Sequence, residues 1–252
     1  RCGPRRAQSG LHDHEIRTNT VEQRMPVVIH EQRAGKAEFT AVCAVGIAVS
    51  TAVAAVQYGA RIPSYEAFIA LNTMLLLWLP ICSVFLLTKL QPADLGFRQG
   101  DERLSRIYGW GMFFAVLPML FLGSLFPSSR SFYPLYRQFP HPDNASWAYL
   151  AYFELTYGWY LFCWEWFFRG FLLFGLWRGI GSWAVVAQAV VFGLLHYQKP
   201  VPEFIASFGA GFALGIAAAR IGSFFPGFLV HWASAVAYDL MIIGWNGFRL
   251  PP

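Results

Sequence analysis

The chain has 252 residues, of which 56% are hydrophobic and only 13% are charged. A soluble domain of ordinary composition carries about 25% charged residues, so this chain has too little polar surface for a water-soluble globule. Its net charge of +5 comes from basic residues spread over short segments, which is typical of membrane-flanking loops rather than a nucleic-acid-binding face. We therefore expect an integral membrane protein whose surroundings are a lipid bilayer, with no nucleic acid partner.

In chain order, a polar segment over residues 1–37 comes first and is a candidate for disorder because it has no long apolar run. Residues 38–252 are expected to form one transmembrane domain. Crossing the hydrocarbon core as a helix takes about 20 apolar residues, and backbone groups in lipid must bond within their own segment. The sequence therefore predicts an all-α, polytopic membrane helix bundle of about seven transmembrane helices, at 39–60, 67–88, 107–126, 146–177, 182–198, 203–219 and 223–245.

The later spans have features of their own. The fourth, 146–177, would be about 48 Å long at 1.5 Å per residue, so it must tilt or begin along the membrane surface. Two prolines in the segment 198–202 are expected to end the fifth helix and to permit the sixth to begin. In the sixth helix, small residues recur every four positions and predict close helix packing: Ser207, Gly211, Gly215 and Ala219.

Ionisable side chains inside membrane helices are costly and usually functional. Those well inside the spans fall in the fourth, fifth and seventh helices, and they are Glu154, Glu165, Arg169, His196, His231 and Asp239. The four-residue spacing of Glu165 and Arg169 stacks them on one helix face, either as a structural ion pair or as a carboxylate held ionised near a reacting water.

Depth in the membrane links three of these groups. We count about 1.5 Å per residue from the helix ends expected on the inner side of the membrane, at residues 177, 182 and 223. This count places Glu165, His196 and His231 at a similar depth in the bilayer. A glutamate with two histidines can activate water and stabilise an oxyanion, or can bind a metal ion. Glu154 and Asp239 are expected to support this site or to face an aqueous cavity.

The motifs resemble the CPBP family of intramembrane glutamic proteases, the group that contains the type II CaaX prenyl proteases and bacteriocin-immunity-type proteins. The family pattern is E-E-x-x-x-R, then F-x-x-x-H, then H-x-x-x-N, each on a membrane helix. Glu165 to Arg169 matches the first motif without its leading glutamate. Phe192 to His196 matches the second motif, and His231 matches the start of the third.

The resemblance covers a core at about 146–243 and implies roles for its residues. In the family, the first glutamate and the motif-two histidine activate water, while the motif-three histidine and asparagine stabilise the oxyanion. Trp164 stands at the first glutamate, and Ala235 stands at the asparagine. The resemblance then implies His196 for water activation, His231 for the oxyanion, and Glu165 as the replacement base.

We therefore expect a glutamic-type intramembrane endopeptidase, a hydrolase without a cofactor or a metal. A metal-dependent protease stays open as a sub-case, because a glutamate and two histidines could hold zinc, although no H-E-x-x-H spacing supports it. Its expected substrate is a membrane-anchored protein or peptide, and family breadth points to a bacterial cytoplasmic membrane. Two alternatives stay open. The chain can be a family member that has lost catalysis and acts as a binding or immunity protein, for which Trp164 and Ala235 argue. It can also be a metal- or proton-coupled transporter that uses the same buried groups.

Overall fold

The computed structural model describes residues 35–59, 62–139 and 146–246. Within these ranges the regular structure is entirely helical, without any strand. Most of the polar segment predicted over 1–37, namely 1–34, lies outside the described residues, so this prediction is not tested.

Seven helical rods in the described residues coincide with the seven apolar spans. They are α1 (Lys36–Tyr58); α2 (Tyr65–Thr73), which continues through the π-helical η1 (Met74–Trp78) into α3 (Leu79–Leu87); α4 (Glu102–Ser124); α6 (Trp147–Glu165), which continues through the π-helical η4 (Trp166–Leu172) into α7 (Leu173–Ile180); α8 (Trp183–Leu194); α9 (Val201–Ile221); and α10 (Phe225–Asn246). Short helices lie in the connections: η2 (Pro92–Leu95), α5 (Pro127–Phe132) and η3 (Leu135–Gln138).

Five of these rods are long and apolar enough to cross a membrane: α1, the α2–α3 rod, α4, α9 and α10. This confirms the prediction of a polytopic helix bundle. The predicted span 182–198 is wrong at its end, because α8 stops at Leu194 after 12 residues. The chain turns there before Pro200, whose ring cannot continue a helix. His196 therefore lies in a turn and not inside a helix.

Polar residues begin several of the helices by satisfying backbone N–H groups that have no partner in the first turn. The side chains of Ser64, Asp101 and Ser146 accept hydrogen bonds from backbone N–H groups three residues later, at the starts of α2, α4 and α6. At its other end, α9 stops at Gly222, whose φ of 79° is a left-handed conformation that favours glycine.

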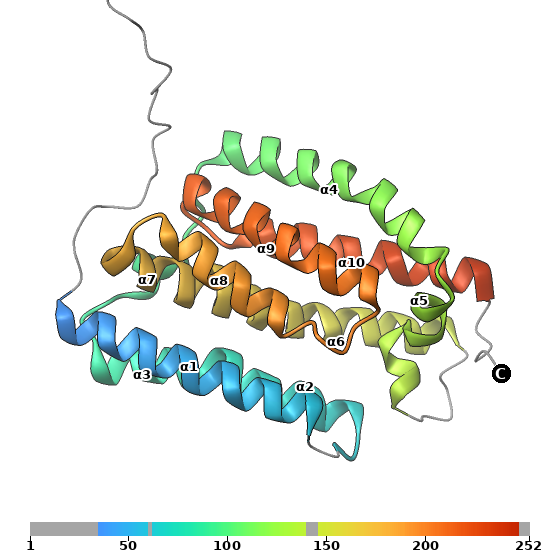
Figure 1. The fold of residues 1–252 in the computed structure, drawn as a ribbon, viewed down its shortest axis with the longest axis horizontal. Coiled ribbons are helices and arrows are strands. Elements are labelled where there is room, and N and C mark those ends of the chain that lie inside the picture. Colours follow the sequence, from blue (N-terminus) through green and yellow to red (C-terminus); the bar gives the residue numbers. More distant parts are fainter. Residues whose placement is uncertain (1–34, 60–61, 140–145, 247–252) are drawn as a thin grey trace, which may run out of the picture.

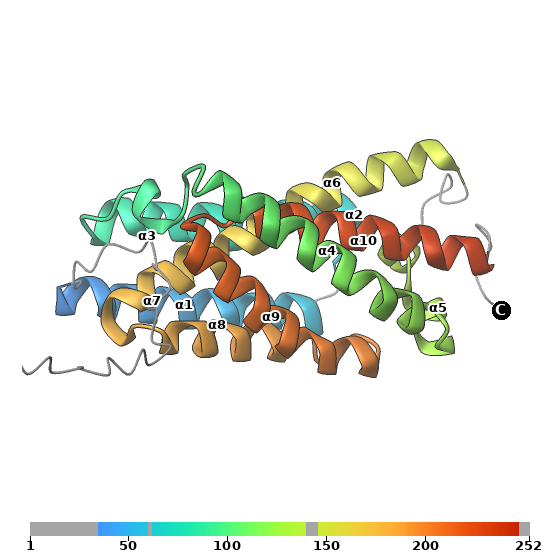
Figure 2. The same ribbon diagram turned by 90° about the horizontal axis from the view of Figure 1, so that it is seen from above.

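The helices lie side by side along the long axis of the molecule (Figure 1). Figure 1 shows α1 with the α2–α3 rod at one edge, α4 at the opposite edge, and the other long helices between them. From above, α2 and α6 lie along one side, and α8 and α9 lie along the other (Figure 2). The α6–η4–α7 rod forms the centre of the bundle, since residues 163–175 are all buried.

The small-residue ridge of α9 packs against α8 as predicted. Ser207, Gly211, Gly215 and Ala219 are all buried. The side-chain amide of Gln188 on α8 donates a hydrogen bond to the Gly211 carbonyl at 2.8 Å. A Cβ atom on Gly215 would collide with that same amide, so the close approach of the two helices, with this hydrogen bond in place, favours glycine there.

Candidate active site

A buried ion pair stands at the junction of α6 and η4. Glu165 ends α6, and Arg169 follows one turn later in the π-helical segment. The Nη1 atom of Arg169 donates to Oε1 of Glu165 at 2.9 Å, and both side chains are fully buried. Opposite charges in contact offset part of each other's desolvation penalty. Single turns of π-helix are rare and frequently lie at functional sites.

His231 reaches the same carboxylate from α10. Its Nδ1 atom lies 2.7 Å from Oε1 of Glu165. Because an ionised carboxylate only accepts hydrogen bonds, Nδ1 carries the proton and Nε2 keeps a free lone pair when the ring is neutral. The His231 side chain is 23% exposed while Glu165 is sealed. Glu165 and His231 therefore form a carboxylate–imidazole dyad in which only the imidazole is accessible from outside the protein.

His196 is held in a similar way by a backbone group. Its Nδ1 atom lies 2.7 Å from the carbonyl oxygen of Phe192. Because a carbonyl oxygen only accepts hydrogen bonds, Nδ1 of His196 carries the proton, and its Nε2 also keeps a free lone pair. The Phe192 ring is the common neighbour of the site. Its centroid lies 4.6 Å from that of His196, 6.1 Å from that of His231, and 4.1 Å from the guanidinium carbon of Arg169.

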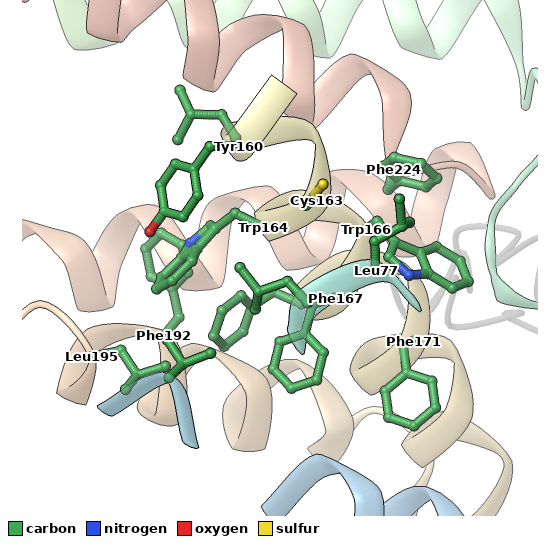
Figure 3. Packing of buried hydrophobic residues seen from close by; sticks show 14 of the residues in the cluster. Leu77, Tyr160, Cys163, Trp164, Trp166, Phe167, Phe171, Phe192, Leu195 and Phe224 are labelled. Atoms are coloured by element: carbon green, nitrogen blue, oxygen red, sulfur yellow. The ribbon is translucent and has the colours of Figure 1, made fainter. Parts of the chain in front are cut away.

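Trp164 stands at the position of the first family glutamate and places an aromatic side chain there. The indole is 3% exposed, and its Nε1 atom has no hydrogen-bond partner among the described residues. Its ring lies 5.8 Å from His196 and nearly perpendicular to it, and 5.9 Å from Phe192. Figure 3 shows Trp164 facing Phe192, while Trp166 faces Phe224 on the other side of the helix. Trp164 therefore packs against the His196 ring.

We expect Trp164 to be replaceable by a ring but not by a small side chain. Trp164→Ala should lower the free energy of unfolding by about 3–5 kcal/mol, because it leaves a cavity among the aromatic side chains. Trp164→Phe should lower it by less than half as much, since the lost N–H has no partner. Thermal unfolding in detergent tests both variants. Equal losses would contradict the view that packing, rather than the N–H, is what this residue contributes.

Glu154 and Asp239 do not join the Glu165 cluster. Glu154 precedes Glu165 by 11 residues on α6, about 16 Å along the axis. Asp239 follows His231 by eight residues on α10, about 12 Å along the axis. The two carboxyl groups instead lie against each other within hydrogen-bonding reach.

A polar cluster near His196 was missed by the sequence analysis. Tyr133 donates to Glu203 with oxygen separations of 2.6 and 2.7 Å, and Lys199 donates to the Tyr133 hydroxyl at 2.6 Å. Burial, with the negative charge of Glu203, raises the pKa of Tyr133 well above its ordinary value. The four-residue spacing of Lys199 and Glu203 indicates their pairing, but no sequence signal links them to Tyr133.

No three histidine, cysteine, aspartate or glutamate side chains in the described ranges are placed to hold a metal ion together. The geometry of Glu165, Arg169, His196 and His231 resembles a hydrolytic site, in which a carboxylate orients a histidine that takes a proton from water.

Comparison with known families bears directly on this site. Residues 143–237 match the family model described as Type II CAAX prenyl endopeptidase Rce1-like. The chain carries an Rce1-like domain. This confirms the family resemblance drawn from the three motifs. The Rce1-like domain runs from just before α6 into α10, so it contains the ion pair and both histidines and ends before Asp239. No curated protein and no solved structure matches the chain.

The Rce1-like domain and the apolar helices together define the broad class of this protein. It is an integral, multi-pass membrane protein, and the Rce1-like match supports a function of the CAAX-type intramembrane protease kind. The bacterial membrane expected from family breadth stays a prediction.

Proposed function

We propose that this protein is an intramembrane endopeptidase that hydrolyses a peptide bond of a membrane-anchored protein substrate. One observation carries the proposal: a single oxygen of the buried Glu165 carboxylate meets both Arg169 at 2.9 Å and His231 at 2.7 Å. A structural ion pair needs only the arginine. Adding a partly exposed histidine to a sealed carboxylate is the arrangement of a general base with its orienting partner.

In the proposed reaction, Nε2 of His231 takes a proton from water as the water oxygen attacks the carbonyl carbon. Glu165 stabilises the imidazolium that forms, and Arg169 keeps Glu165 ionised and in place. The imidazolium then gives its proton to the leaving amine as the C–N bond breaks. His196 accepts a hydrogen bond from the other O–H of the same water through its own Nε2 and so orients the attack.

This division differs from the one implied by the family resemblance, in which Glu165 replaces the base and His231 stabilises the oxyanion. Glu165 is fully buried and its Oε1 atom already has two partners. Its geometry therefore favours action through His231 rather than direct contact with water.

A second candidate is a family member that has lost catalysis and acts by binding. Trp164 favours this candidate, because its indole packs against His196 at the position where the family has its usual base. This candidate predicts no cleavage of any substrate, and it predicts that the histidines matter only for folding.

Cleavage of membrane-anchored peptides by the purified protein in liposomes separates the two candidates. We expect His196→Ala to lower kcat/KM by about 100-fold, as for loss of one positioned acid–base group. Tyr197→Phe, next along the chain and exposed, should leave the rate unchanged. Thermal unfolding checks that both variants fold. If a folded His196→Ala variant cleaves as fast as the wild type, the role given to His196 is wrong. If the wild type cleaves none of a broad panel, the binding candidate is favoured.

A further inference from the structure

Two contacts join α6 and α10, the helices that carry the proposed dyad. Each of them involves a carboxyl group of α6. In one, Glu165 of α6 meets His231 of α10. In the other, Glu154 meets Asp239, and this contact lies nearer the start of α6 and further along α10. Near the second contact, the indole N–H of Trp232 on α10 donates to the Glu154 carbonyl at 2.9 Å. The relative placement of α6 and α10 is thus set at both sites together.

The second contact contains two acids and is buried. Glu154 is 8% exposed and Asp239 is 3% exposed. Neither carboxylate oxygen of Glu154 meets a hydrogen-bond donor in the described residues. Two carboxylates cannot bond to each other, because both only accept. A single proton placed between them converts this repulsion into a hydrogen bond.

The groups around this pair do not replace that proton. Two cations face Asp239 from other elements, Arg137 of η3 and Lys199 of the α8–α9 turn. Lys199 is already engaged with Tyr133 and Glu203, and Arg137 donates to the Tyr133 carbonyl. The remaining titratable neighbours are one acid and four hydroxyls: Glu203, Tyr133, Tyr136, Tyr157 and Tyr238.

We propose that Glu154 and Asp239 are positioning residues that hold α6 and α10 in register through one shared proton. With the proton present, the pair ties the helices together and keeps His231 at hydrogen-bonding distance from Glu165. When the proton is lost, two buried negative charges repel, α10 shifts against α6, and the dyad loosens. The site therefore works only while the pair is singly protonated.

The sign of the pH dependence follows from proton counting. The folded protein holds one proton more than the two acids hold when they are separated in the unfolded chain. Stability therefore falls as the pH rises above the range where ordinary carboxyl groups ionise. Glu154→Gln removes this dependence, because the amide donates to Asp239 at every pH.

The experiment compares thermal unfolding of the full chain in lipid nanodiscs from pH 5 to pH 9. We expect the midpoint of the wild type to fall relative to that of Glu154→Gln by about 3 °C or more over this range. Asp239→Asn tests the same bond from the other side and serves if the first variant does not fold. Glu102→Gln, on an exposed side chain, should follow the wild type. Parallel curves for the wild type and both pair variants would overturn the proposal.

A cleavage assay over the same pH range adds a readout that a merely structural contact would not move. This arm rests on the proposed function, whereas the unfolding arm does not. The wild type should lose cleavage toward alkaline pH, and Glu154→Gln should keep a larger share of its own rate. Equal alkaline loss in a folded Glu154→Gln variant would overturn the positioning role. If unfolding behaves as expected but nothing is cleaved at any pH, the shared proton stands and the peptidase proposal fails.

Discussion

Replacing Glu165 by glutamine is expected to lower kcat/KM by about 100-fold or more. The change also leaves the Arg169 charge buried without its partner and so lowers the free energy of unfolding, so the rate is measured on protein that thermal unfolding shows to be folded. Glutamine has the same size, but it lacks the negative charge that fixes the proton on Nδ1 of His231 and stabilises the imidazolium. Loss of such an orienting carboxylate lowers the rate although the histidine remains in place. Initial rates on a membrane-anchored peptide in liposomes measure the effect.

The matched control is Glu102→Gln, the same chemical change at the exposed start of α4. It should leave the rate within about twofold of the wild type, as is usual for surface substitutions. The two roles considered for Glu165 predict different residual activities. If Glu165 contacted the water directly, its loss would be as severe as loss of His231. If it acts through His231, Glu165→Gln should keep more activity than His231→Ala. Cleavage by Glu165→Gln at the wild-type rate would exclude both roles.

The positions of the helices could be predicted because the bilayer imposes them. A run without charges, such as 67–88, has few options in lipid other than a helix, and α2, η1 and α3 occupy 65–87. The end of α8 could not be placed as well, because apolar residues also pack in turns. Neither π-helical segment was predicted, since its backbone hydrogen bonds depend on the surrounding helices as much as on the local sequence.

The proposed site was predictable where it depends on local periodicity. The four-residue spacing of Glu165 and Arg169 placed them on one face, and the structure shows them bonded. Membrane depth suggested that the histidines converge on Glu165, but it could not say which one meets the carboxylate. The partner of Glu154 could not be predicted from the sequence either. Its contact with Asp239 joins residues 85 positions apart, so it depends on how α6 and α10 pack.

Replacing Arg169 by methionine is expected to lower the free energy of unfolding by about 3–5 kcal/mol, because it leaves the Glu165 charge buried without its main partner. Thermal and denaturant unfolding in detergent measure the loss.

The double variant E165Q/R169M separates stability from activity. In the described residues, Nε and Nη2 of Arg169 have no hydrogen-bond partner, so the arginine itself is costly to bury. Removing both charges should therefore recover most of the stability lost by Arg169→Met alone, as replacement of a buried pair by neutral groups often does. Cleavage should stay as low as in Glu165→Gln. A double variant as unstable as Arg169→Met would show that Arg169 acts by packing on Phe192 rather than by balancing charge. Recovered stability without recovered cleavage would show that a buried pair that is dispensable for folding is retained for the dyad it orients.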